Sequence, residues 1–122
     1  MSIPFYGDGS SRRDYTYIDD IADGVEAALD REASGFEIVN LGGATPVTLT
    51  ELVAAIEKAT GRTAILDRQP SQPGDVPVTY AAVEKARRLL GFRARVPLAE
   101  GLRRSVDWYR RGRSGAGRQP AA

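Results

Sequence analysis

Arg13 and Asp75 are the two side chains of this sequence whose types and settings could build a ligand contact. Arg13 follows a turn at residues 7–10 and stands where an extended segment gives way to a helix, so its guanidinium can point into a cleft. A guanidinium presents a planar fork of donors that matches the edge of a phosphate. Asp75 lies between Pro73 and Pro77, which stiffen the backbone, and its carboxylate can accept two hydrogen bonds from a diol such as ribose. These residues predict an anion contact and a diol contact.

Each residue also has a purely structural interpretation. Arg13 can form a weak surface ion pair with an acid at the helix entry, where the candidates are Asp14, Asp19 and Asp20. The segment around Asp75 can be a proline-rich connector whose aspartate only caps the next turn. Arg12 is expected to face solvent in either case. Local sequence leaves these alternatives open.

Cysteine and histidine are both absent from the 122 residues. Their absence excludes disulfides, thiolate and imidazole metal sites, cysteine nucleophiles and Ser-His triads. Any catalysis within this chain would depend on carboxylates, tyrosine or lysine. We identify no catalytic residue and no metal site.

Four helices are predicted to position these residues. The first carries an apolar stripe from Ile18 to Leu29 and is expected to take Asp19 or Asp20 as its N-cap. The second begins with the capping box Thr48–Glu51, ends at Gly61, and should bury an apolar face made of Leu49, Leu52, Val53 and Ile56. The third runs from Val83 to a stop at Gly91, and the last begins near Pro97.

Short strands are predicted between the helices. Residues 36–41 alternate and are rich in β-formers, and residues 63–67 should form a second short strand. A strand at 36–41 has no obvious neighbour in this chain, so its open edge would have to pair within the chain, pair with another chain or aggregate. Prolines at 70, 73 and 77 should keep the segment between them extended.

Several separated motifs together resemble one known family. They are GDGS at 7–10, RDYTYIDD at 13–20, FEIVNLGG at 36–43, QPGDV at 72–76, KARRLLGF at 85–92 and LAEGL at 98–102 followed by Trp108-Tyr109. In this order they resemble the C-terminal portion of NAD-dependent nucleotide-sugar epimerases and dehydratases, members of the extended short-chain dehydrogenase/reductase family. The likeness is strongest to UDP-glucuronate and UDP-glucose 4-epimerases, and it extends to about Arg111.

The resemblance implies an α/β fold, or α+β for the isolated fragment. The chain would be the C-terminal substrate-binding lobe, with about four helices and two or three short strands, and the Rossmann core would be missing. Residues 1–47 would pack on the nucleotide-binding sheet, residues 48–111 would form a small α/β substrate-binding lobe, and residues 112–122 would be a disordered tail.

The resemblance also implies roles for four residues. Arg13 would hold the diphosphate of a UDP-sugar, with Tyr15 packing nearby. Gln72 and Asp75 would hold the phosphate and ribose side from the opposite loop. Relatives often carry arginine where this chain has Gln72, so the phosphate should depend more strongly on Arg13 here.

NAD is the cofactor implied for the parent enzyme, but none is expected to bind this chain alone. Gly7-Asp8-Gly9 lacks the third glycine of a dinucleotide fingerprint, and Tyr80 has Glu84 where a Tyr-x-x-x-Lys pair needs lysine, with Lys85 one place late. We therefore expect the isolated chain to position a nucleotide sugar for oxidation and reduction at C4 without catalysing it. The alternative is a stand-alone binding or interaction module that pairs with a Rossmann-domain partner or forms a homodimer.

Charge is distributed unevenly along the chain. Residues 1–61 carry four basic and eleven acidic side chains, a net charge of −7, whereas residues 62–122 carry thirteen basic and five acidic ones, a net charge of +8. The halves should attract each other. Without interleaved aromatics, the arginines of the second half indicate a solvated helix face rather than a nucleic-acid site. No apolar run approaches the ~18 residues of a membrane span, and the first residues open no signal peptide, so we expect no membrane contact and a cytoplasmic location.

Overall fold

The computed structural model describes residues 2–32 and 34–115. The described part contains four helices, as expected: α1 (Ile18–Leu29), α2 (Leu49–Thr60), α3 (Glu84–Leu90) and α4 (Leu98–Gly115). It also contains five short strands: β1 (Ile3–Tyr6), β2 (Arg12–Arg13), β3 (Val47–Thr48), β4 (Leu66–Gln69) and β5 (Val78–Thr79). The fold is mixed helix and strand, with more strands than the two or three that were predicted.

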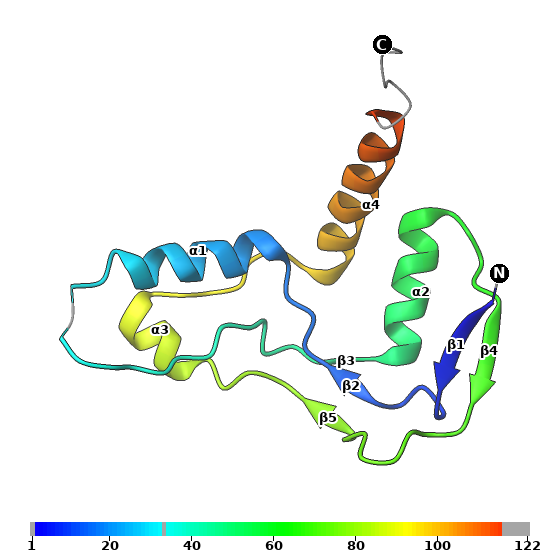
Figure 1. Ribbon diagram of the computed structural model, residues 1–122, viewed down its shortest axis with the longest axis horizontal. Helices are drawn as coiled ribbons and strands as arrows, with labels where there is room; N and C mark the ends of the chain where they lie inside the picture. The colour runs from blue at the N-terminus through cyan, green and yellow to red at the C-terminus, as the bar shows by residue number, and fades with distance from the viewer. Residues whose placement is uncertain (1, 33, 116–122) are drawn as a thin grey trace, which may run out of the picture.

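The elements form an elongated molecule with a small sheet at its centre (Figure 1). At one end α1 packs on α3, and at the other α2 packs on α4 beside the parallel pair β1·β4. Between them, β2 pairs antiparallel with β3 and parallel with β5. Both parallel pairs join the first 13 residues to residues 66–79. The central sheet thus brings together segments that are distant in sequence.

The capping box that opens α2 is confirmed. The Thr48 hydroxyl accepts from the Glu51 amide at 3.1 Å, and the Thr48 amide donates to Glu51 Oε2 at 2.7 Å. Gly61 ends the helix in the left-handed region with φ at +71°. The side chains satisfy orphan amides of the first turn, so a local sequence signal was sufficient to fix both ends of α2.

Replacing Thr48 with alanine is expected to lower the free energy of unfolding by about 1 kcal/mol, because it removes the hydroxyl that accepts from the Glu51 amide while the backbone amide at position 48 can still donate to Glu51. Urea unfolding followed by circular dichroism measures the change. Thr48→Ser keeps the hydroxyl and should stay close to wild type. Equal loss in both variants would contradict the capping explanation.

The predicted N-cap of α1 is wrong. Tyr17 occupies that position without a side-chain cap, and Asp19 and Asp20 both lie in the first turn. Asp20 is only 3% exposed, and its carboxylate accepts from the backbone amides of Arg95 and Val96, each at 3.0 Å. Tertiary contacts, rather than capping, use this aspartate. It ties the start of α1 to the connection between α3 and α4.

The strand predicted at residues 36–41 is not formed. Phe36 and Ile38 are 86% and 66% exposed, so the alternating pattern lies on the surface with no strand beside it. A strand needs a partner ladder as well as β-forming residues. The strand predicted at 63–67 appears slightly later, as β4, because its register is set by pairing with β1.

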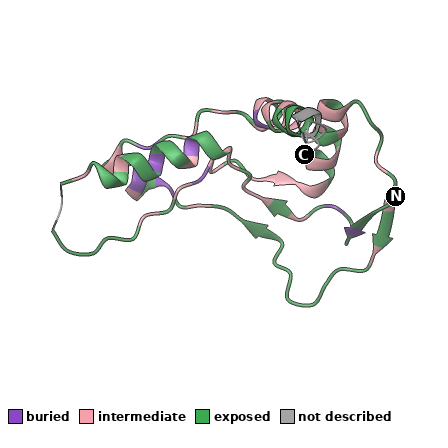
Figure 2. Ribbon diagram, turned by 45° about the horizontal axis from the view of Figure 1, so that its top comes forward, coloured by how far each residue is buried: buried purple, intermediate pink, exposed green. Residues whose placement is uncertain are grey.

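The buried core is small and lies mainly between α1 and α3 (Figure 2). Its apolar members are Phe5, Val83, Ala86 and Phe92. The predicted apolar face of α2 is not buried. Ile56 is 39% exposed, and every residue of this helix keeps part of its surface exposed. That face instead borders an open apolar hollow of about 610 Å³ between α2 and the β1·β4 pair.

The last two helices largely follow the sequence pattern. Gly91 ends α3 with φ at +64°, and α3 has no side-chain N-cap. Helix α4 continues to Gly115, although a disordered tail was predicted from residue 112, and residues 116–122 lie outside the described part. Among the described helices, none combines the length and apolar character needed to cross a membrane.

Candidate functional site

The central sheet places Arg13 beside the proline-framed loop. Arg13 lies opposite Thr79 in the parallel β2·β5 pair, and the Arg12 amide donates to the Pro77 carbonyl at 2.8 Å. Just before β5 the backbone turns, with the Asp75 amide donating to the Gln72 carbonyl at 3.2 Å. Gly74 allows this turn, because its φ of +84° lies in a region that residues with a side chain rarely adopt. The carboxylate of Asp75 is therefore delivered to the side of β2.

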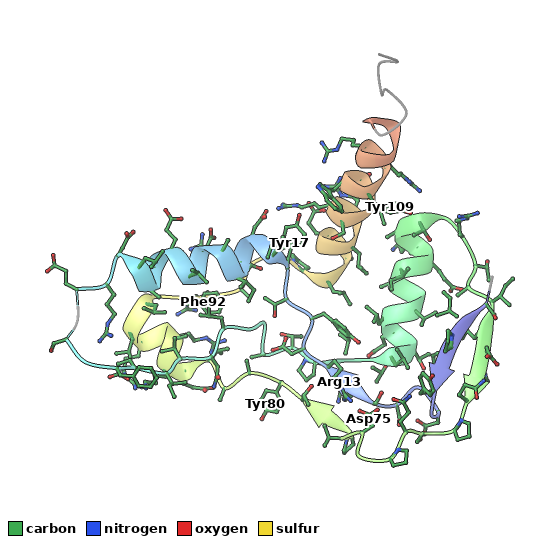
Figure 3. The ribbon with its side chains drawn as sticks, viewed as in Figure 1. Arg13, Tyr17, Asp75, Tyr80, Phe92 and Tyr109 are labelled. Carbon is green, nitrogen blue, oxygen red and sulfur yellow. The ribbon has the colours of Figure 1, made fainter. Side chains whose placement is uncertain are left out.

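Arg13 and Asp75 form an ion pair in which Nη2 of Arg13 donates to Oδ1 of Asp75. Figure 3 shows the two residues side by side near β2 and β5. The side chains remain 28% and 48% exposed, so both stay within reach of a ligand. The structure thus brings together the two residues that the sequence singled out. The alternative pairing of Arg13 with the acids at the helix entry is not what forms, and Arg12 is exposed, as predicted.

A polar pocket lies on the Asp75 side of this ion pair. We use this name for the hollow of about 380 Å³ lined by residues 6–11, 71 and 75–77. Within it, Asp8 accepts from the amide and hydroxyl of Ser10 at 2.9 and 2.6 Å, and these hydrogen bonds lower the pKa of the Asp8 carboxyl. The ionised carboxylates and serine hydroxyls suit a partner rich in hydroxyl and N–H donors.

A tyrosine pocket lies on the Arg13 side. We use this name for the open hollow of about 520 Å³ lined by residues 13–16, 41–42 and 79–81, which include Tyr15 and Tyr80. Tyr80 is 65% exposed. Tyrosine rings provide apolar faces with a polar edge, which suit a sugar ring or a base.

Asp14 holds the tyrosine pocket together, a role that the sequence interpretation missed. Its carboxylate accepts from the amides of Gly43, Ala44 and Ala81 at 3.2, 2.9 and 3.3 Å. A Cβ added at Gly42 would lie 2.5 Å from that of Ala81, so the segments approach too closely for any other residue. The Gly42-Gly43 pair is the one local sequence feature at this contact, and it does not identify Asp14 or Ala81 as the partners.

The other two predicted site residues, Tyr15 and Gln72, are linked less directly to the Arg13–Asp75 ion pair. Tyr15 lines the tyrosine pocket with Arg13 but has no hydrogen bond to it among the described residues. Gln72 is exposed and contributes its backbone carbonyl to the turn at Asp75, while its side chain borders neither pocket. The ion pair and the residues lining the two pockets therefore define the candidate site more firmly than Gln72 does.

The described residues do not fit a dinucleotide cofactor or a Tyr-Lys pair. The Gly7–Gly9 turn leads into β2, whereas a dinucleotide fingerprint leads from a strand into a helix whose N-terminus receives the pyrophosphate. Lys85 Nζ is bonded to Glu37 Oε2 at 2.6 Å, and Tyr80 precedes α3 rather than lying on it. We therefore assign no catalytic or cofactor-binding residue within the described part.

A larger hollow, of about 1180 Å³, lies elsewhere, between the start of α1 and α4, and is lined by none of the predicted site residues. Its arginines are already engaged. Arg103 and Arg104 donate to Glu100 at 2.7 to 2.9 Å, Arg104 stacks over the ring of Tyr17, and Arg110 donates to the Thr60 carbonyl at 2.9 Å. Volume alone does not make this hollow the better candidate, because its charged groups have internal partners.

The Glu100 network makes a prediction about pH. Hydrogen bonds from Arg103 and then Arg104 lower the pKa of Glu100 from 4.5 to about 2. Because the pKa is depressed on folding, the network's stabilisation should be complete above pH 4.5 and be lost as pH falls through about 2. Carbon-13 NMR of the carboxyl groups should show this midpoint for Glu100. Arg103→Gln together with Arg104→Gln should return it towards 4.5, and a wild-type midpoint near 4.5 would contradict the assignment.

Comparison with known proteins shows the family to which this chain belongs. A family model described as GDP-mannose 4,6 dehydratase matches residues 1–105. UDP-glucuronate 4-epimerase of Thermodesulfobacterium geofontis is 39% identical over 107 residues, covering 87% of this chain and 32% of that protein. The structure of MoeE5 in complex with UDP-glucuronic acid and NAD has a TM-score of 0.85 at 32% identity, covering 91% of this chain and 37% of that one.

A second structural relative gives the same result. UDP-glucuronic acid 4-epimerase from Bacillus cereus, in complex with UDP-glucuronic acid and NAD, has a TM-score of 0.81 at 32% identity, covering 90% of this chain and 35% of that one. The chain spans about a third of the length of the relatives it matches. It therefore belongs to the family of NAD-dependent nucleotide-sugar epimerases and dehydratases that its motifs resemble, and its similarity is to the UDP-sugar 4-epimerases.

Proposed function

We propose that this chain is the nucleotide-sugar-binding part of an NAD-dependent sugar epimerase or dehydratase, and that it positions a UDP-sugar for oxidation and reduction at C4. The observation that carries the proposal is the ion pair between Arg13 and Asp75, which lies between the tyrosine pocket and the polar pocket. The complexes of MoeE5 and of the Bacillus cereus enzyme with UDP-glucuronic acid support the substrate class.

The chemistry of the two pockets suggests how such a ligand lies. The Arg13 guanidinium suits the diphosphate, because it remains charged and donates in a planar fork. The carboxylates of Asp75 and Asp8 suit the hydroxyl and N–H donors of the nucleoside, which places that end in the polar pocket. The sugar then lies in the tyrosine pocket against Tyr15. Gln72 is proposed to approach the phosphates from the loop.

In this proposal the redox and proton-transfer steps belong to the parent enzyme rather than to this chain. Both related structures are complexes with NAD, which supports NAD as the cofactor of the parent. The residues described here do not fit a dinucleotide, so we expect this chain alone neither to bind NAD nor to convert a nucleotide sugar. The division at residues 47 and 48 and the cytoplasmic location expected from sequence are part of the same proposal.

A second candidate function is an interaction module, and the exposed surface favours it. Exposed apolar side chains gather on α1 and the segment after it: Ile18, Val25, Leu29, Phe36 and Ile38. Such a face suits a Rossmann-domain partner or a second copy of the chain.

Titration of UDP-glucuronate into the 15N-labelled chain tests the proposed function. We expect chemical-shift changes at Arg13, Tyr15, Asp75 and the residues lining both pockets, and none with glucuronate alone. Shifts confined to the hollow between α1 and α4, or no shifts at millimolar ligand, would contradict the proposal. Sedimentation tests the second candidate: a dimer dissociated by Phe36→Ser with Ile38→Ser would favour the interaction module.

A further inference from the structure

The Arg13–Asp75 ion pair stands between two separate pockets. Asp75 lines the polar pocket and not the tyrosine pocket, whereas Arg13 lines the tyrosine pocket and not the polar one. The pair is therefore a bridge whose two ends belong to different hollows.

The topology explains this separation. The polar pocket is built from residues that precede β2 and β5, and the tyrosine pocket mainly from residues that follow them. Because β2 and β5 run parallel, the pockets lie at opposite ends of this short ladder. The guanidinium of Arg13 reaches back across the ladder to the carboxylate of Asp75.

The carboxylate of Asp75 takes the guanidinium edge that a phosphate would also use. Arg13 Nη2 donates to Asp75, and Nη1 donates to the carbonyl of Arg12 at 2.8 Å. A carboxylate and a phosphate oxygen are alternative acceptors for the same fork of donors. Both partners are partly exposed, so the pair is weak enough for a ligand to displace.

We infer that the Arg13–Asp75 ion pair is a gate within the proposed site: Asp75 competes with the ligand's diphosphate for Arg13, and displacement of Asp75 joins the two pockets into one groove. This inference rests on the proposed function. A diphosphate that takes over Arg13 frees the Asp75 carboxylate for the hydroxyl groups of the nucleoside. Opening of the ion pair is thereby coupled to recognition of the nucleoside. An anion that lacks a nucleoside also opens the pair, but it gives Asp75 no new partner.

The test compares inorganic pyrophosphate and UDP on the 122-residue chain by calorimetric titration. Asp75→Asn removes the competing charge and should tighten pyrophosphate binding about two- to fivefold, the range set by an exposed ion pair. UDP should gain less, because it loses an acceptor for its ribose. The gain for pyrophosphate should vanish when Arg13→Gln is added, since the two residues act on one step.

Glu37→Gln is the matched control, because it changes the net charge by the same amount and breaks another exposed ion pair, Glu37–Lys85, away from both pockets. It should leave pyrophosphate affinity unchanged. An equal gain in this control, or unchanged or weaker pyrophosphate binding in Asp75→Asn, would overturn the gate. Unchanged affinity in Arg13→Gln alone would instead refute the proposed anion contact, and equal gains for UDP and pyrophosphate would refute only the ribose role of Asp75.

A measurement on the wild-type chain makes the test independent of any variant's folding. In 15N NMR, pyrophosphate should shift the side-chain Nε–H of Arg13 and the amide of Asp75 with the same midpoint. A shift at Arg13 while the Asp75 amide stays unmoved would show that the pair does not open, and would overturn the gate while leaving the anion contact intact.

Discussion

Replacing Arg13 with glutamine is expected to weaken binding of UDP to this chain about ten- to a hundredfold. Hydrogen bonds to a charged group contribute about 1.5–3 kcal/mol. Arg13 is the cationic residue among those lining the two pockets, and its ion pair with Asp75 connects one pocket to the other. Arg13→Lys retains the charge but loses the planar fork, so it should recover only part of the affinity. Calorimetric titration at fixed ionic strength measures all three proteins.

Arg12 provides the control for this experiment. It is the neighbouring residue on β2, carries the same charge and is exposed to solvent. Arg12→Gln should therefore leave the affinity for UDP close to that of wild type. If both substitutions weaken binding equally, the effect comes from general attraction by positive charge rather than from a contact made by Arg13.

Replacing Asp20 with alanine is expected to lower the free energy of unfolding by about 2–4 kcal/mol, because two partly buried amides lose the charged acceptor of a buried carboxylate. These amides belong to Arg95 and Val96 and lie 3.0 Å from the carboxylate, which is 3% exposed. Asp20→Asn keeps one acceptor oxygen and should cost less. Urea unfolding followed by circular dichroism gives the free energies.

Asp19 is the matched comparison for Asp20. It lies in the same turn of α1 but is exposed, and its link to Arg104 is a surface pair at 3.5 Å. Asp19→Ala should change the unfolding free energy by less than about 1 kcal/mol. If the two alanine variants unfold alike, Asp20 does not hold the connection between α3 and α4.

Local signals were the ones that could be read from the sequence. The Thr48–Glu51 capping box and the glycine stops at Gly61 and Gly91 involve residues within one or two turns, and all three are confirmed. Asp20 was misassigned as a cap because its amide partners lie 75 and 76 residues away. Residues 36–41 were misassigned as a strand because periodicity reports on the side chains and not on whether a partner ladder exists.

The candidate site was predictable through the family motifs rather than from local chemistry. Local sequence left Arg13 divided between a ligand contact and an ion pair at the helix entry, and it did not predict Asp75 as the pairing partner. The uneven charge of the halves was informative, since Glu37–Lys85 and Asp19–Arg104 both join the acidic half to the basic half. The bracing role of Asp14 depends on amides from two distant segments, which no spacing rule reveals.

The parallel pairs also decide how this chain would respond to being cut. The segment at residues 34–41 is outside every helix and strand, while β1 and β2 precede it and their partners β3, β4 and β5 follow it. A protease that cuts this segment would produce two fragments that share both sheets. Strand β1 of the first fragment would pair with β4 of the second, and β2 of the first would lie between β3 and β5 of the second. The chain is therefore suited to division at this point into complementary halves that reassemble, with Arg13 supplied by one piece and Asp75 by the other.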